Sequence, residues 1–414
     1  MAGLVLLQPP LIRADPVVEV GPEDTTAAGA VVEVGPEDTT AASAVEDENR
    51  GLWTFPFLIT FGVHGGYDSN PNTTRNGSGS GFTDEQLTLA YDRLRGSLDL
   101  KTLAALGVVE RFDGETDVNT SLDFSLSYHA SPRLTLGATV NAVYTSEPSF
   151  AANVGPTQRA GNYFATTDGL SAAYQWLPRF TTVSTYSFSL VRYQNGSTAA
   201  FSDRQENTLG EEFRFDLWRD TVLVADYRFL LVNYVTNPLD STTNFALAGV
   251  EHVFSPRLRG QFRGGVSFRS FDQGGSEVDP EVEGSLDYAL GRHSSIGWTA
   301  RYGVEQPTEQ NSAGQVTFRT GVQFRYAFTA RISSAVGFNY QHNDNQGGVS
   351  STGSVQPTGA SFATDAYDVL ASLRYQINRR LDCDLGFQHS ENASADAFQD
   401  YTRNRYSVGL NFTF

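Results

Sequence analysis

The chain has 414 residues, of which 40% are hydrophobic, 12% aromatic and only 18% charged, against roughly 25% charged in an average globular protein. Its net charge of -18 excludes a nucleic-acid-binding protein, because phosphate binding needs a basic surface. The single cysteine, Cys383, excludes a disulfide framework and a cysteine-rich metal site. No apolar run of about 18 residues occurs, which excludes a transmembrane helix but leaves open a membrane β-barrel with alternating strands.

The N-terminal region differs from the rest of the chain. Residues 1–14 start with an apolar stretch and end at Ala14, so we interpret them as the remnant of a signal peptide without its basic part. Residues 15–51 are acidic, lack aromatic residues and contain the repeat VVEVGPEDTTAA twice, at 17–28 and 31–42. Such a segment cannot bury enough surface to fold, which predicts a disordered leader. A spacer, a docking segment and a plug all remain open for it.

From residue 52 to residue 414 apolar and polar residues alternate over stretches of about 10–14 residues, which is the pattern of β-strands. Soluble sheets usually have strands of about 5–6 residues. In the last strand the apolar positions are Tyr406, Val408, Leu410, Phe412 and Phe414. The length and the alternation indicate strands that cross a membrane.

The connections between these strands alternate between short and long. Short ones contain Pro, Arg or Asn, at about 95–96, 131–133, 177–179, 219–220, 255–257, 291–292, 329–331 and 378–380. Long ones are rich in Gly, Asn, Ser and Asp, at 67–83, 112–118, 147–161, 194–204, 236–242, 271–278, 305–313, 343–362 and 391–400. This predicts an all-β, transmembrane, antiparallel up-and-down barrel of about 18 strands, from 52–66 to 401–414, with both termini periplasmic. The loop 343–362 is a candidate for an inward-folded constriction.

Soluble β-folds fit less well. A propeller would repeat a blade motif every 40–45 residues or so, and sandwich strands are shorter. Here one side of nearly every strand is apolar while the other mixes Arg with Asp and Glu, as expected when lipid surrounds the sheet and water fills it. Aromatic residues form two bands typical of membrane interfaces: Trp53, Tyr128, Trp176, Trp218, Phe254, Phe328 and Phe414 by the short turns, and Tyr144, Tyr193, Tyr234, Tyr302, Tyr340 and Tyr401 by the loops.

The last strand, ending in Phe414, resembles the C-terminal assembly signal of bacterial outer-membrane proteins. This resemblance implies that the barrel-assembly machinery recognises Tyr406, Val408, Leu410, Phe412 and Phe414. The segment GVHGGYDSN at 62–70, together with the Ser-Pro-Arg-Leu turns, resembles the putative β-barrel porin family of type 2 over about residues 52–414. The resemblance implies a Gram-negative outer membrane and lipid contact.

Enzymatic chemistry finds little support. The six histidines are scattered without an HExxH motif, and no Gly-x-Ser-x-Gly elbow occurs. His342 and Asp344 beside a long loop suggest an Asp/His hydrolase of the omptin kind, but a polar loop end explains them better. Asp68, Asp344 and Asp365 in loops lack an EF-hand pattern. Cys383 shares parity with Leu385 and is read as lipid-facing. We predict no enzyme, no metal and no cofactor.

The polar side of the strands predicts the residues that line a pore. These are Arg259, Arg263, Arg269, Glu281, Glu283, Asp287, Arg301, Arg319 and Arg325 in one sector, and Asp92, Asp99 and Asp123 in the sector opposite. Facing Arg and carboxylate side chains either stiffen the wall as cross-strand pairs or filter solutes through a transverse field. Both interpretations remain open.

A barrel of 16–18 strands leaves an aqueous channel. The sequence therefore predicts a porin-like channel for passive diffusion of small polar solutes. The alternative is a conduit or scaffold of an export system, for example for polysaccharide, with the leader docking a periplasmic partner. A homo-oligomer is compatible with either.

Overall fold

The computed structural model describes residues 57–147, 159–194, 200–307, 312, 314–346, 348–349, 355–356, 362–394 and 400–414. The predicted signal-peptide remnant, the leader and Trp53 lie outside these residues, and so does most of the predicted constriction loop 343–362. Within the described residues, no helix is long and apolar enough to cross a membrane.

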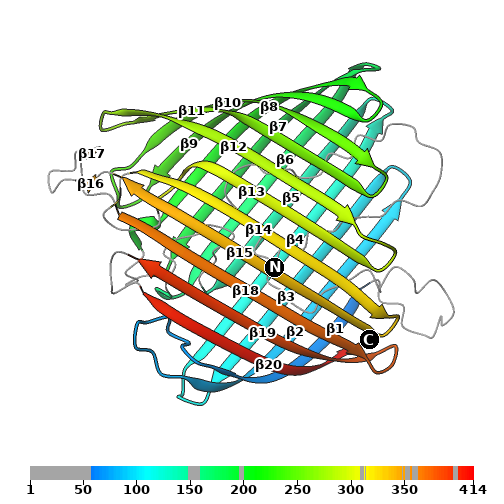
Figure 1. The fold of residues 1–414 in the computed structure, drawn as a ribbon, viewed down its shortest axis with the longest axis vertical. Coiled ribbons are helices and arrows are strands. Elements are labelled where there is room, and N and C mark those ends of the chain that lie inside the picture. The colour runs from blue at the N-terminus through cyan, green and yellow to red at the C-terminus, as the bar shows by residue number, and fades with distance from the viewer. Residues whose placement is uncertain are drawn as a thin grey trace.

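Eighteen antiparallel strands form one closed wall, as the sequence predicts (Figure 1). The strands are β1 Leu58–Asp68, β2 Ser80–Arg95, β3 Leu98–Arg111, β4 Thr116–Ser131, β5 Leu134–Thr145, β6 Tyr163–Leu177, β7 Phe180–Tyr193, β8 Arg204–Trp218, β9 Thr221–Tyr234, β10 Ser241–Ser255, β11 Leu258–Phe271, β12 Ser276–Ala289, β13 Ser294–Glu305, β14 Gly314–Thr329, β15 Ile332–Gln346, β18 Phe362–Gln376, β19 Leu381–Ser394 and β20 Tyr401–Thr413. A short hairpin, β16 Gly348–Val349 and β17 Val355–Gln356, and one 3₁₀ turn, η2 Ala200–Ser202, lie in the connections.

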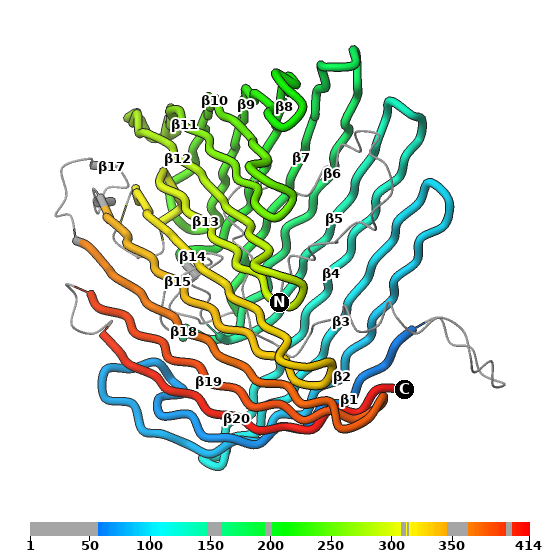
Figure 2. The backbone as a smooth tube through the Cα atoms, turned by 45° about the vertical axis from the view of Figure 1, so that its right-hand side comes forward, coloured from blue at the N-terminus to red at the C-terminus, as the bar shows by residue number. Residues whose placement is uncertain are grey.

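The first and last strands close the barrel. Strand β1 pairs with β2 on one side and with β20 on the other, where Thr60 lies opposite Thr413 and Asp68 opposite Arg405. Figure 2 shows β1 in blue beside β20 in red. The start of β1 and the end of β20 therefore lie at the same rim as the short turns.

Hydrogen bonds within the turn stabilise the Ser-Pro-Arg turns. The Oγ of Ser131 accepts hydrogen bonds from the backbone N–H groups of Arg133 at 3.2 Å and Leu134 at 3.1 Å. Ser255 does the same for Arg257 and Leu258, at 3.3 and 3.1 Å. The proline between presets the backbone angle of the turn, so the polar side chain and the ring together fix a tight connection.

Several predicted loops are shorter than expected, two of them by about half. The connections at 112–118 and 271–278 shrink to residues 112–115 and 272–275, because the flanking strands extend further. Gly114 and Gly274 have φ angles of 95° and 93°, a conformation that a residue without Cβ adopts at no steric cost. The first strand also ends later than predicted, at Asp68 rather than residue 66.

The two sides of the wall differ as the alternation predicts. Outward side chains such as Phe61, Val63 and Leu209 are apolar and exposed, whereas inward ones such as Asp226, Arg228 and Glu281 are polar and buried. The lipid-facing surface is therefore apolar and the interior polar. Cys383 shares the outward side with Leu385.

The predicted aromatic band by the loops is partly wrong. Tyr193, Tyr234 and Tyr401 are 8%, 9% and 4% exposed and lie on the inward side of β7, β9 and β20. They occupy the inward parity of their strands, so they pack inside the wall rather than at the lipid interface. Tyr144, Tyr302 and Tyr340 lie on the outward side.

Candidate functional site: the inner wall

All of the residues predicted to line a pore lie on the inward side of their strands. Arg259, Arg263 and Arg269 share that side of β11 with the buried Ser267. The others follow the same parity: Glu281, Glu283 and Asp287 on β12, Arg301 on β13, Arg319 and Arg325 on β14, and Asp92, Asp99 and Asp123 on β2, β3 and β4. Their role in lining an open pore stays a prediction.

On β3 and β11 the exposure of inward side chains falls from the short-turn rim to the loop rim. Near the short turns, the side chains of Asp99 and Arg259 are 32% and 50% exposed, whereas Arg111 and Arg269 near the loops are 6% and 1% exposed. The closing strands differ, because Asn411 near the short turns is 4% exposed. The interior is therefore more open to solvent at the short-turn rim on the side of β3 and β11.

An ion-pair belt crosses the inner side of β8 to β14. Carboxylates and guanidiniums alternate along it: Glu212, Arg214, Asp226, Arg228, Glu251, Arg263, Glu281, Glu283, Arg301, Glu305 and Arg319. Arg228 donates hydrogen bonds to the carboxylate of Glu283 from both terminal nitrogens, at 2.9 and 3.1 Å. Such two-point contacts between Arg and a carboxylate are among the stronger polar interactions.

Within the belt, Arg263 lies among three carboxylates, with N···O distances of 3.0 Å to Glu212 and 3.5 Å to both Asp226 and Glu251. Arg301 lies 3.8–3.9 Å from Glu281, Glu283 and Glu305. Neighbouring carboxylates thus neutralise the positive charges of Arg263 and Arg301 locally. Arg325 has no carboxylate partner among the described residues and keeps its charge facing the interior.

A second ion cluster, which we call the mouth cluster, lies at the loop rim. It consists of Asp68 on β1, Arg111 on β3, Asp117 on β4, Arg403 on β20, and Ser146, Glu147 and Arg159 between β5 and β6. Arg403 contacts Asp68 at 2.5 Å and Glu147 at 2.5 Å, and Arg111 contacts Asp117 at 2.7 Å. The residues that follow β5 therefore reach over the inner side of β4, β3 and β20.

Arg159 holds the C-terminal end of the connection between β5 and β6 against the barrel wall. It pairs with Asp117, donates to Ser146 at 2.7 Å, and its backbone N–H donates to Thr73 at 2.6 Å in the β1–β2 loop. Burial together with the charges of Arg111 and Arg403 lowers the pKa of Arg159 to about 10. Two inward contacts, at Glu147 and Arg159, thus narrow the mouth from the side of β20 to β4.

The charge state of Glu147 follows from its neighbours. Burial alone would raise the pKa of this carboxyl, but the charge and hydrogen bonds of Arg403, with Arg405 and Arg111 nearby, lower it to about 2. Glu147 is therefore ionised at any physiological pH. Sequence analysis did not single it out, because a loop residue has no strand parity that would show where it points.

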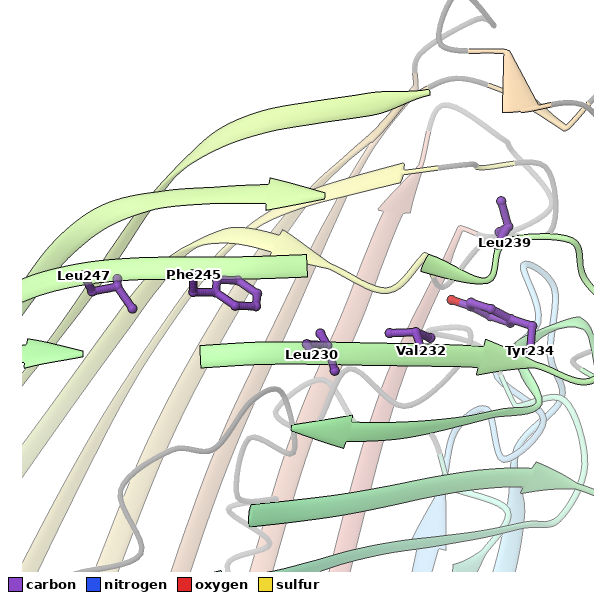
Figure 3. Close-up of a cluster of buried hydrophobic side chains, with 6 residues drawn as sticks. All are labelled: Leu230, Val232, Tyr234, Leu239, Phe245 and Leu247. Atoms are coloured by element: carbon purple, nitrogen blue, oxygen red, sulfur yellow. The ribbon is translucent and has the colours of Figure 1, made fainter. Parts of the chain in front are cut away.

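An apolar cluster lies on the inward side of β9 and β10. Figure 3 shows Leu230, Val232 and Tyr234 along β9, Phe245 and Leu247 along β10, and Leu239 in the loop that joins these strands. The hydroxyl of Tyr234 donates to Gln306, which follows β13, at 3.2 Å. Arg269 donates to the carbonyl of Glu305 at 3.3 Å. The end of β13 thus folds inward over this cluster and narrows the mouth from a second side.

Toward the loops, uncharged polar side chains cover the inward side of β14 and β15. Thr317 donates to Asn343 at 3.1 Å, and Gln341 donates to the same amide oxygen at 2.9 Å. Gln315 and Asn345 lie on the same side and are 1% exposed. This amide wall separates the ion-pair belt from the strands that close the barrel.

At the closing seam, His64 of the GVHGGYDSN segment contacts Asp384 on β19 at 3.1 Å. Asn411 on β20 bridges Asp384 and Asp382, donating at 2.7 and 3.1 Å. A Cβ at Gly409 would overlap the imidazole ring of His64. The glycine in β20 therefore makes room for a polar link across the first and last strands.

The candidate enzymatic residues do not assemble in the interior. His342 lies on the outward side of β15, where its Nδ1 is 2.8 Å from Asp365, and Tyr340 donates to the same carboxylate at 2.7 Å. Among the described residues, no three His, Cys, Asp or Glu side chains are grouped as metal ligands. The proposed assembly-signal residues Tyr406, Val408, Leu410, Phe412 and Phe414 all point outward and are 38–67% exposed.

Comparison with solved structures finds distant likenesses. The siderophore receptor PirA from Pseudomonas aeruginosa is 11% identical, with a TM-score of 0.42 over 87% of this chain and 80% of that chain. Pseudomonas aeruginosa OpdK with vanillate is 12% identical, with a TM-score of 0.41 over 86% and 99%. Acinetobacter baumannii OccAB4 is 12% identical, with a TM-score of 0.41 over 87% and 99%. These scores are too low to support a functional argument.

No curated protein matches the sequence. The family model described as Putative beta-barrel porin 2, in contrast, matches residues 54–414, which is the whole barrel and confirms the resemblance found in the sequence. This chain belongs to the Putative beta-barrel porin 2 family and is an outer-membrane, porin-like β-barrel.

Proposed function

We propose that the barrel is a passive channel for small polar solutes. The supporting observation is the exposure gradient along β11, from the half-exposed Arg259 near the short turns to the almost fully buried Arg269 near the loops. Such a gradient describes a wide vestibule that leads to a narrow filter. Apart from the apolar cluster on β9 and β10, charged and amide side chains line both parts, so water and polar solutes are the suitable contents.

The test is single-channel recording on the purified full chain in planar bilayers, together with swelling of liposomes in small neutral sugars. We expect discrete conductance steps and swelling rates that fall as the solute grows. Absence of both in correctly folded, heat-modifiable barrels would contradict the channel.

A second candidate is an export conduit, and the amide wall favours it. Gln315, Gln341 and Asn343 carry uncharged donors and acceptors on the inward side of β14 and β15, where they are 1–2% exposed and Gln341 donates to Asn343. Uncharged groups suit a polyhydroxylated chain better than an ion. A conduit predicts that linear sugar oligomers block the ionic current more strongly than monosaccharides do. Equal block by both would favour simple diffusion.

For assembly, we extend the proposal to the last strand and the barrel-assembly machinery. The outward, exposed residues from Tyr406 to Phe414 provide an apolar recognition surface, while the backbone N–H of Phe414 donates to Ile59 at 2.9 Å. Phe414→Ala removes only the ring, whereas deletion also removes this hydrogen bond. Recognition of the ring predicts fewer assembled barrels for both variants. Normal assembly of Phe414→Ala would assign the role to the seam instead.

In this proposal the short-turn rim faces the periplasm, and the first and last residues of the barrel lie at that rim. The leader then extends into the periplasm. Protease added to intact cells should then spare residues 15–51, and protease admitted to the periplasm should remove them. A homo-oligomer stays a prediction.

A further inference from the structure

The carboxylate of Glu147 binds the guanidinium of Arg403 in the way that the carboxylate of a ligand would. Nη1 of Arg403 contacts Oε2 at 2.5 Å and Nη2 contacts Oε1 at 3.2 Å. A nitrogen of Arg111 lies 3.7 Å from the same carboxylate. Two parallel N–H···O contacts from a planar fork are the geometry by which Arg recognises carboxylates in general.

The two arginines are held in place by other partners. Arg403 is fixed by Asp68 on the adjacent edge of the guanidinium, with Nε at 3.0 and 3.1 Å from the two oxygens. Arg111 is fixed by Asp117 at 2.7 Å. Their side chains are only 5% and 3% exposed, so they stay oriented whether or not Glu147 is present. A preorganised site binds more tightly because less side-chain entropy is lost on binding.

Glu147 is the carboxylate that pairs with the outer nitrogen of Arg403. Without Glu147, Arg111 keeps Asp117 and the more exposed Glu115, and Arg403 keeps Asp68 at Nε and Nη2. The Nη1 of Arg403, which donates to Glu147, is then buried without that partner, and an unpaired buried group of a charged side chain is costly. A single carboxylate from solution would satisfy it.

Glu147 can leave the site by rotation of its own side chain. Its backbone N–H donates to Thr145 at 3.1 Å and its carbonyl accepts from Tyr163 at 3.0 Å, which fixes the main chain beside β5 and β6. The side chain itself is 20% exposed, whereas its arginine partners are almost fully covered. Solvent in the mouth therefore reaches the carboxylate first.

We infer that Arg403 and Arg111 form a binding site for carboxylate solutes at the mouth of the channel, and that Glu147 is an internal ligand which a solute carboxylate replaces. The inference rests on the proposed channel and names a solute class for it. No bond is made or broken; one carboxylate exchanges for another. An internal ligand that fills the site most of the time weakens the apparent affinity for the solute by the fraction of time the site is free.

The experiment measures acetate binding by saturation-transfer NMR on the purified full chain in detergent, which reads binding whether or not the barrel conducts. Glu147→Gln removes the competing charge, so acetate should bind about tenfold more tightly than to the parent, the change expected if the site is free about a tenth of the time. The matched control is Glu110→Gln, next to Arg111 on β3 but on the outward, exposed side. It should behave as the parent.

Arg403→Lys in the Glu147→Gln background keeps the charge beside Asp68 but removes the fork, and should abolish most of the gain. Equal acetate binding by the parent and Glu147→Gln, or a gain that also appears in Glu110→Gln, would overturn the inference. If the lysine variant does not assemble, the comparison of the two glutamine variants decides alone. Absence of conductance in a parent that gains acetate binding through Glu147→Gln would contradict the channel and leave the site standing.

Discussion

Single residues decide how the closing seam packs. His64 occupies space that exists only because residue 409 has no Cβ, and its imidazole links β1 to Asp384 on β19. The sequence shows the glycine-rich segment around His64 but gives no sign that a glycine almost 350 residues later accommodates it. Contacts between distant residues of this kind depend on the register of the closed barrel.

Gly409→Ala should destabilise the barrel by about 1–3 kcal/mol, the usual cost of overpacking, because the new methyl group overlaps the His64 ring. The midpoint of heat-induced unfolding on gels measures this. Gly107→Ala, also on an inward side, meets no atom closer than 3.6 Å and should stay within about 0.5 kcal/mol of the parent. Equal midpoints for the two variants would contradict the packing argument.

The contact of Glu147 with Arg403 should resist acid. The folded pKa of Glu147 is about 2 against an ordinary value of 4.5, because Arg403, Arg405 and Arg111 face it. A lowered pKa means that the stabilisation is complete above pH 4.5 and is lost as the pH falls through 2. Channel current in the parent should therefore show no step from this residue between pH 7 and 5. A step in this range that Glu147→Gln abolishes would contradict the low pKa.

At the scale of strands, the alternating pattern was sufficient to predict the elements and their two sides. On β5, Val140 points outward and Asn141 inward, as parity requires. The pattern was insufficient at the strand ends, where Tyr193, Tyr234 and Tyr401 pack inside although their type suits a lipid interface. Loops have no parity at all, so the reach of Glu147 and Arg159 across the mouth depends on the closed barrel and was not predictable.

A matched pair on β5 tests which side faces lipid. Val140→Arg places a charge in hydrocarbon and should cost about 2–4 kcal/mol near the middle of the membrane. Asn141→Arg, one residue away, enters the exposed interior and should change stability little. The measurement is urea unfolding of both variants in lipid vesicles. A larger loss for Asn141→Arg would reverse the assignment of the two sides.

At the scale of the molecule, the inner wall compensates most of its charges locally. The ion-pair belt and the mouth cluster both alternate in sign, so the net field across the interior is smaller than the row of arginines on β11 to β14 suggests. Parity placed these arginines on the inward side of their strands but could not show which carboxylates surround each of them. Selectivity should therefore depend on the few charges without such compensation.

Arg325 is such a charge. Arg325→Gln should shift the reversal potential in a salt gradient toward cations, because it removes an inward positive charge that no carboxylate neutralises among the described residues. Arg93→Gln, on the outward side of β2, should leave the reversal potential unchanged. An unchanged value for both variants would mean that Arg325 does not face the ion path.

The pairing of β1 with β20 has a consequence for how the chain folds. Thr60 and Thr413 are neighbours in space although 353 residues separate them in sequence. Hairpins between consecutive strands can form early, since far fewer residues separate their strands, whereas this pairing must wait for every other strand. Until then the sheet has two open edges with unsatisfied backbone groups, which attract other chains. Loss of a few residues from β1 or β20 should therefore leave these edges open permanently. Such a chain should aggregate or be proteolysed rather than form a smaller barrel.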